Sequence, residues 1–232
     1  MYEMSSNVHG RPPRFRREQI AQVAFEIADR EGFDAVSMRR VARELGAGTM
    51  TLYSYVRTKD ELVALMDDQL MGELLVSEQD LARAWPDAFI AILRQTYRLR
   101  LKHPWSLTAM QNAGLGPNAA RHAEQTLAAL EGSPFNDEQK FMVMTVADSF
   151  VDGHALHRIE VTTEQAPAAA VPARSLEGLE RIASGPYPHM HRTWGALESG
   201  RPVAAAWMDE SFERGVRAML EGFVRQLSDP ST

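Results

Sequence analysis

Apolar residues recur at helical spacing through most of the chain, and no stretch shows the alternation of a β-strand. Between residues 20 and 28 they fall at i, i+3, i+4 and i+7, which predicts an amphipathic helix that ends at Gly32. The longest apolar stripes lie in residues 137–158 and 208–227. The pattern therefore predicts an all-α protein.

Two short helices joined by a glycine turn are predicted after the first helix. Ser37 can cap a helix of about two turns, and Gly46 supplies the left-handed residue that ends it. The next short helix begins near Gly48 and runs through Tyr55, and a capping box at residues 58–61 opens a long fourth helix. Two short helices braced by longer ones present one of them to a DNA major groove.

Composition narrows the class of protein. The 232-residue chain is 44% hydrophobic and contains no cysteine, which excludes disulfides, thiolate zinc sites and cysteine nucleophiles. No apolar run approaches the ~18 residues of a membrane span, and the basic start lacks the uncharged core of a signal peptide, so we expect a cytoplasmic protein without a membrane partner. The net charge of −6 divides into +1 for residues 1–62 and −7 for residues 63–232, so a small basic surface is outweighed by an acidic remainder.

Three motifs share one register between about residues 16 and 65. They are RRVARELG at 39–46, TLYSYV at 51–56 and TKDEL at 58–62. With these residues the chain resembles the tetracycline-repressor family of one-component regulators. Gly48 and Val56 depart from the common pattern, in which a polar cap and a phenylalanine are frequent, and a glycine N-cap costs only a few tenths of a kcal/mol.

The resemblance implies a domain organisation and a mode of action. It divides the chain into a flexible basic arm over 1–15, a three-helix helix-turn-helix DNA-binding domain over 16–60, and a helical effector-binding and dimerisation domain over 61–228 with a mobile loop at 161–185. In the family two long helices pair with their copies, so we expect a homodimer through residues 137–158 and 208–227. The expected function is a ligand-responsive repressor that binds palindromic operator DNA and is released by a small hydrophobic or aromatic effector.

Side-chain chemistry and the resemblance together predict the DNA contacts. Arg39 carries a planar guanidinium that suits O6 and N7 of guanine, and its position resembles a base-contacting arginine of the family. Lys59 stands at a helix N-terminus, where its ammonium group and the helix dipole favour the same phosphate. Residues 11–17 fit either a minor-groove arm or a solubilising tail. The predicted DNA-binding residues are Arg39, Arg40, Thr49, Met50, Thr51, Tyr53, Ser54, Tyr55 and Lys59.

The C-terminal part is similar to the tetracycline-repressor subtype of the family, but its pocket chemistry differs. Met110 stands where the resemblance places a metal-binding histidine, and a thioether is a poor ligand for magnesium, so a magnesium–tetracycline complex is not the expected effector. An apolar pocket with a few hydroxyls suits a hydrophobic or aromatic compound. Its predicted lining is Ile92, Thr96, Met110, Thr126, Phe150, His154 and Trp194.

No catalytic, metal or cofactor site is predicted. The sequence has no phosphate-binding glycine loop, no Gly-x-Ser-x-Gly elbow and no His-Glu-x-x-His pair. His154 and His157 are three residues apart on a predicted helix, but two histidines make an incomplete metal site, and a place in the effector pocket or the dimer interface explains them better. Two alternatives stay open: an enzyme with an accessory DNA-binding module, and a DNA-binding regulator without an effector.

Overall fold

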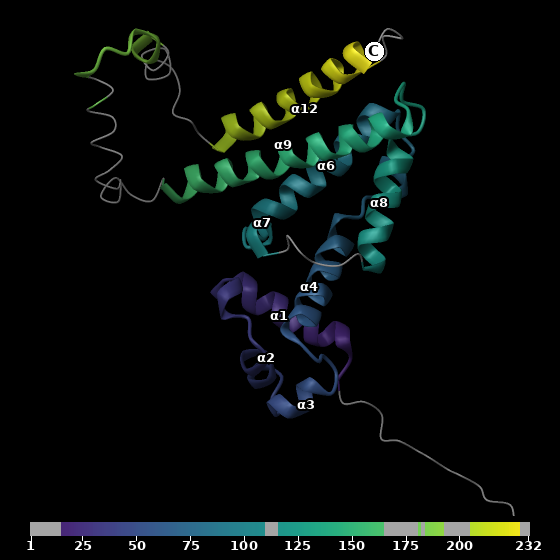
Figure 1. The fold of residues 1–232 in the computed structure, drawn as a ribbon, viewed down its shortest axis with the longest axis vertical. Helices are drawn as coiled ribbons and strands as arrows, with labels where there is room; N and C mark the ends of the chain where they lie inside the picture. Colours follow the sequence, from purple (N-terminus) through teal and green to yellow (C-terminus); the bar gives the residue numbers. More distant parts are fainter. Residues whose placement is uncertain (1–14, 110–115, 165–180, 182–183, 193–204, 228–232) are drawn as a thin grey trace, which may run out of the picture. The chain divides into compact units, whose positions relative to one another are not determined.

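The computed structural model describes residues 15–109, 116–164, 181, 184–192 and 205–227. These residues form helices and turns and no strand, which confirms the all-α prediction (Figure 1). The helices are α1 (Arg17–Glu31), the 3-10 turn η1 (Phe33–Ala35), α2 (Met38–Glu44), α3 (Thr49–Tyr53), α4 (Lys59–Leu74), α5 (Glu78–Leu81), α6 (Trp85–Lys102), α7 (Ser106–Ala109), α8 (Pro117–Ala129), α9 (Asp137–Glu164) and α12 (Ala205–Leu227).

The chain divides into two compact units. The N-terminal unit contains Met1–Glu73 and Thr108–Arg121, and the C-terminal unit contains Leu74–Leu107 and His122–Thr232.

The turn signals of the N-terminal unit lie where the sequence predicts them. α1 ends at Gly32, which has a φ of 85°. The Ser37 hydroxyl caps α2 by accepting a hydrogen bond from the backbone N–H of Arg40 at 3.2 Å. Gly46 follows α2 with a φ of 61°, a left-handed conformation that glycine adopts without steric cost. Gly32 and Ser37 thus set the end of α1 and the start of α2, and Gly46 forms the turn between the two short helices.

α3 is shorter than predicted. It ends at Tyr53 rather than Tyr55, because the backbone N–H groups of Ser54 and Tyr55 donate to the carbonyls three residues earlier, those of Thr51 and Leu52, at 3.2 and 2.9 Å. Such i to i+3 bonds tighten the last turn and stop the helix. Val56 is fully buried and anchors the chain beneath α3.

The capping box at the start of α4 is displaced by one residue from its predicted form. The Thr58 hydroxyl accepts from the backbone N–H of Glu61 at 3.0 Å, as predicted. The Glu61 carboxylate, however, accepts from the backbone N–H of Arg57 at 2.6 Å and also pairs with Arg17 at 2.5 Å. One carboxylate therefore links the beginning of α1 to the beginning of α4.

Asp68 on α4 fastens the beginning of α8. Its carboxylate accepts from the backbone N–H of Asn118 at 2.7 Å and from the Asn118 side chain at 3.1 Å, and the Asn118 amide also donates to the Asp68 carbonyl at 3.0 Å. Gly116 lies so close that an added Cβ would meet the Asp68 carboxylate at 2.2 Å. A glycine is therefore required at residue 116.

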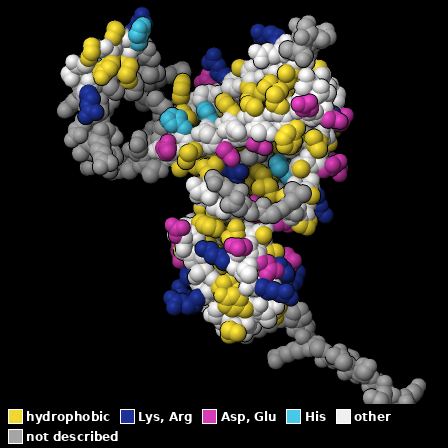
Figure 2. All heavy atoms as spheres, viewed as in Figure 1, with side chains coloured by type: hydrophobic (Ala, Val, Ile, Leu, Met, Phe, Trp, Pro, Cys, Tyr) yellow, Lys and Arg dark blue, Asp and Glu magenta, His cyan; other side chains and the backbone are white. Residues whose placement is uncertain are grey.

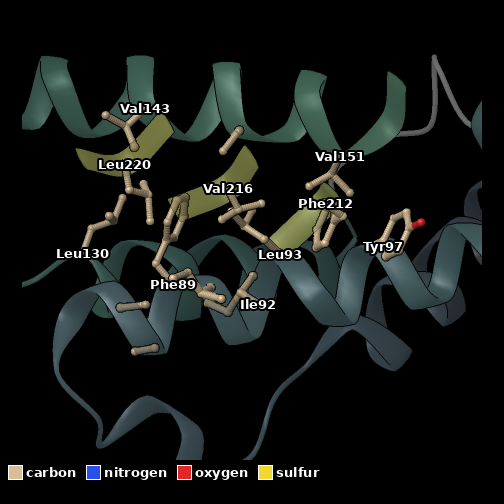
Figure 3. Close-up of a cluster of buried hydrophobic side chains, with 14 of the residues drawn as sticks. Phe89, Ile92, Leu93, Tyr97, Leu130, Val143, Val151, Phe212, Val216 and Leu220 are labelled. Atoms are coloured by element: carbon tan, nitrogen blue, oxygen red, sulfur yellow. The ribbon is translucent and has the colours of Figure 1, made fainter. Parts of the chain in front are cut away.

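The core of the C-terminal unit is built by α6, α9 and α12. Side chains from all three helices meet in one apolar cluster, with Leu130 from the end of α8 at one side (Figure 3). Tyr97 stacks on Phe212 with ring centroids 4.1 Å apart. α9 continues to Glu164, into the first residues of the loop expected at 161–185, because no glycine or proline follows Gly153 until Pro167. Most of that loop lies outside the described residues.

Candidate functional site

α3 exposes most of its side chains. Leu52 is the only buried residue of this helix, whereas Met50 is 82% and Tyr53 is 42% exposed. Thr51 and Ser54 are also exposed, and the Ser54 hydroxyl donates to the Thr51 carbonyl at 2.7 Å. A helix this short buries one anchor and presents the remaining side chains outward, which is the form of a recognition helix.

Arg39 and Arg40 are neighbours on α2 with different surroundings. Arg40 donates two hydrogen bonds to the Glu31 carboxylate, at 2.6 and 3.1 Å, and a third to Glu44. These bonds raise the pKa of Arg40, and the bond from Arg40 lowers the pKa of Glu31 to about 2. The Arg39 side chain is exposed and pairs with no carboxylate in the part of the chain that the structure describes. Arg40 therefore braces α1 against α2, and Arg39 is open to a ligand.

The remaining predicted DNA contacts lie at the two ends of this surface. Lys59 is exposed at the start of α4, with its ammonium nitrogen 5.5 Å from the centre of the Phe33 ring. Tyr55 is half-buried and makes an edge-on contact with Phe15, with ring centroids 6.0 Å apart. Thr49 is half-buried at the start of α3. The structure thus brings the predicted residues together on α2, α3 and the start of α4, with Arg40 facing its own carboxylates.

α9 carries large apolar side chains that its own unit leaves uncovered. Phe141 is 71% exposed. Trp207, on α12, is 41% exposed. The other exposed large apolar residues of α9 are Met142, Val146 and Leu156. α9 and α12 contain the two segments for which the sequence predicts a dimer interface, residues 137–158 and 208–227, and Trp207 lies directly before the second.

The predicted effector residues fall into separate groups. Met110 and Trp194 lie outside the described residues. Ile92, Thr96 and Thr126 are buried. The two threonine hydroxyls donate to the carbonyls four residues earlier, at 3.1 and 2.8 Å. They therefore keep only acceptor capacity for another partner.

Phe150 and His154 belong to an aromatic cluster on the side of α9 that meets α12. The His154 ring lies 5.6 Å from the rings of both Phe150 and Phe212. His154 Nε2 is 2.8 Å from the Met208 carbonyl oxygen. Because a carbonyl only accepts, this nitrogen carries the proton and donates. The bond occupies His154 within its own unit.

Sequence reasoning missed a charged cluster between α6, α8 and α9. The Arg100 guanidinium donates to Asp152 at 2.8 Å and to the Ser106 hydroxyl at 3.2 Å. Burial and the neighbouring Asp152 raise the pKa of Asp148 to about 6. Burial, and then Arg100, lower the pKa of His122. The available clue was the i, i+4 spacing of the two aspartates within an apolar helix.

Neither a metal-binding cluster nor a membrane-spanning helix occurs among the described residues. No group of three or more His, Cys, Asp or Glu side chains is arranged to hold a metal ion there. His157 lies 3.8 Å from Glu160 on the surface of α9. No described helix is both long enough and apolar enough to cross a membrane.

Two family models match the chain. The model for bacterial regulatory proteins of the tetR family matches residues 20–66. The model for a tetracyclin repressor-like C-terminal domain matches residues 79–227. Together they cover the helix-turn-helix and most of the C-terminal unit.

Individual proteins are similar over most of the chain. The HTH-type transcriptional repressor DrrR1 of Streptomyces coeruleorubidus is 35% identical over 193 residues, which cover 78% of this chain and 69% of the repressor. An HTH-type transcriptional regulator of Saccharopolyspora erythraea is 28% identical over 217 residues, which cover 90% of this chain and 85% of that regulator. The Streptomyces coelicolor TetR family protein ActR, solved in complex with actinorhodin, is 29% identical in sequence. Its structure matches with a TM-score of 0.72 over 91% of this chain and 96% of the ActR chain.

Proposed function

The chain belongs to the tetR family of bacterial regulatory proteins, and from that membership we propose that it is a repressor that binds operator DNA as a homodimer. A small molecule bound in the C-terminal domain, residues 61–228, releases the DNA. The observation that carries this proposal is the exposed surface of α2 and α3, which leaves Arg39 and Met50 open beside one buried anchor, Leu52. Binding to the chromosome places the protein in the cytoplasm.

The proposed recognition uses base and phosphate contacts. Arg39 reads a guanine in the major groove, and Met50 and Thr51 offer a methyl-bearing surface to thymine methyl groups. Tyr53, Ser54 and Lys59 hold the phosphates on either side. Arg40 contributes indirectly, because its ion pairs with the acidic residues of α1 and α2 fix the helix that carries Arg39.

The proposed homodimer is supported by the uncovered apolar side chains of α9 and α12. Phe141 and Trp207 are 71% and 41% exposed in a single chain, and full burial of an exposed side chain such as Phe141 contributes about 1.5–3 kcal/mol. A second copy, related by a two-fold axis, would cover the same face on both chains. The homodimer interface is therefore proposed at residues 137–158 and 208–227.

Ligand control is supported by the C-terminal half. ActR, which is similar over 91% of this chain, was solved in complex with actinorhodin. The regulator-type C-terminal domain spans residues 79–227, the part of the chain that an enzymatic module would have to occupy. This favours a regulator without catalysis over an enzyme with an accessory DNA-binding domain.

The experiment is a selection of DNA duplexes from a random library with the purified full-length protein, followed by sedimentation of the selected complex. We expect a near-palindromic site with half-site centres about 34–36 Å apart, bound by two chains. Phe141→Glu should shift free protein toward monomers and weaken binding, while the control variant Glu124→Gln, at an exposed residue of α8 outside the proposed interface, should leave both unchanged. Selected sites without a repeat, or one chain per duplex, would contradict the proposal.

A further inference from the structure

A cavity of about 360 Å³ lies in the C-terminal unit between α6 and the segment 75–83 that precedes it. Three arginines, Arg83, Arg94 and Arg98, and one acidic residue, Asp80, take part in its lining. Arg94 and Arg98 are spaced at i, i+4 on α6 and share a helix face, whereas Arg83 lies in the turn before α6. Guanidinium groups from two segments of the chain therefore line the same space.

The charge of this cavity contrasts with that of the surrounding sequence. Residues 63–232 carry a net charge of −7, and Figure 2 shows acidic side chains at many points on one face of the C-terminal unit, among hydrophobic ones. Three arginines beside one aspartate reverse the sign locally. A basic cavity of this volume attracts anions of small-molecule size.

Hydrogen bonds hold the wall of the cavity that precedes α6. The Gln125 side chain accepts from the backbone N–H of Val76 at 3.0 Å and donates to the Val76 carbonyl at 3.1 Å. The Ser77 hydroxyl accepts from the backbone N–H of Asp80 at 3.2 Å and donates to the Asp80 carboxylate at 2.8 Å. The wall is therefore formed in advance, and a ligand does not have to order it on binding.

Two of the arginines are positioned by carboxylates. Arg94 donates to both oxygens of Glu213, with one of the two bonds at 2.6 Å, and Arg83 lies 3.0 Å from Asp80. These bonds fix the directions of the guanidinium groups. A guanidinium carries more N–H donors than such bonds use, so both arginines keep donors for a ligand.

Arg98 has no carboxylate partner among the described residues. Its side chain is exposed, and the two carboxylates at the cavity are already bonded to the other two arginines. Asp87, near the start of α6, lies 3.8 Å from Arg217 instead. One positive charge is therefore left without a partner in this part of the described structure.

We propose that this cavity binds the phosphate group of a small soluble phosphate monoester, with Arg98 as the main contact and Arg83 and Arg94 as supporting donors. Planar guanidinium groups bind phosphate oxygens in pairs, and a phosphate monoester offers three terminal oxygens and a charge of about −1.5 to −2 at pH 7. A carboxylate offers two oxygens and a single charge. The charged lining separates this cavity from the apolar pocket proposed for a hydrophobic or aromatic effector, so it is a second binding site of the protein.

The test compares ribose 5-phosphate with ribose, which lacks the phosphate, and with gluconate, which carries a carboxylate instead. Binding of each compound to the full-length protein is measured by isothermal titration calorimetry at about pH 7.5 without DNA. We expect ribose 5-phosphate to bind at least about tenfold more tightly than either of the other two. This comparison uses the unaltered protein and does not depend on the folding of a variant.

Two variants locate the site. Arg98→Gln should lower the affinity for ribose 5-phosphate at least about tenfold, and it leaves no carboxylate among the described residues without its partner. Arg121→Gln makes the same change of charge at an exposed residue of α8 that does not line the cavity, and it should keep the affinity. Equal binding of ribose 5-phosphate and ribose, equal or tighter binding of gluconate, no binding of ribose 5-phosphate, or a loss in Arg98→Gln no greater than in Arg121→Gln would overturn the inference.

Discussion

The adjacent arginines of α2 give a paired test of which residue reads DNA. We expect Arg39→Ala to remove sequence discrimination and Arg40→Ala to lower thermal stability. The difference follows from their surroundings: Arg39 is exposed without a carboxylate partner among the described residues, while Arg40 is bonded to Glu31 and Glu44. Removal of Arg40 would take three hydrogen bonds from Glu31 and Glu44 and leave Arg30, which pairs with them at 2.8 and 3.2 Å, as their shared cation.

The magnitude for Arg39 can be worked from one contact. A bidentate arginine–guanine pair is worth about 1–3 kcal/mol of discrimination. A homodimer presents Arg39 twice, so Arg39→Ala should cost ~2–6 kcal/mol of operator binding, or at least about 30-fold in affinity. Affinity for a scrambled duplex should change little, because phosphate contacts dominate non-specific binding.

The assay is fluorescence anisotropy with the selected operator and a scrambled duplex of equal length, together with a thermal unfolding curve for each variant. Arg39→Ala should keep the melting temperature of the unaltered protein. Equal weakening of both duplexes by Arg39→Ala would show that Arg39 contacts phosphate. Loss of discrimination in Arg40→Ala without a change in melting temperature would refute the bracing role drawn from its ion pairs.

Three further predictions use the same protein. Lys59→Ala should weaken all duplexes alike and reduce the slope of log affinity against log salt by about one, and a sequence-dependent effect would count against a phosphate contact. Leu52→Ala should lower the free energy of unfolding by ~2–5 kcal/mol, because Leu52 is fully buried. Met50→Ala should change the free energy of unfolding by no more than about 0.5 kcal/mol. Equal losses for the two variants in denaturant unfolding would contradict the anchor role of Leu52. The bond from Arg40 lowers the pKa of Glu31 to about 2, so the stabilising effect of Glu31 is complete above pH 4.5 and is lost as the pH falls toward 2. The melting temperature of Glu31→Gln should therefore depend less on pH over this interval than that of the unaltered protein. An equal pH dependence of the two melting temperatures would exclude the effect.

Local patterns predicted most helices and the ends of α1 and α2, whereas the ends of α3 and α9 and the contacts between helices differ from or go beyond those patterns. Gly32, Ser37 and Gly46 work through their own backbone or a neighbour three residues away, so the sequence is sufficient to place them. The pairing of Arg40 with Glu31 crosses from one helix to another, and no spacing rule predicts it. The sequence therefore predicts Arg39 and Arg40 alike as DNA contacts, and only the structure shows that Arg40 is bonded to acidic residues while the Arg39 side chain is exposed.

The charged cluster of the C-terminal unit shows the same division. Thr96 and Thr126, predicted to line the effector pocket, lie one turn away from Arg100 and His122 on the same helix faces. The cluster itself depends on the packing of α6 beside α9, which brings Arg100 to Asp152 across 52 residues of sequence. Which charged side chains meet can be read only after the helices are placed.

The bonds between Asp68 and Asn118 join the start of α8 rigidly to the middle of α4. Three hydrogen bonds join them, and there is no room at residue 116 for a side chain that would separate them. From Asp68 back to Lys59, α4 extends about 14 Å as a continuous helix, so we expect a displacement at the start of α8 to move Lys59, the residue proposed to hold a phosphate. Gly116→Ala should therefore alter operator affinity without touching either the DNA or the effector.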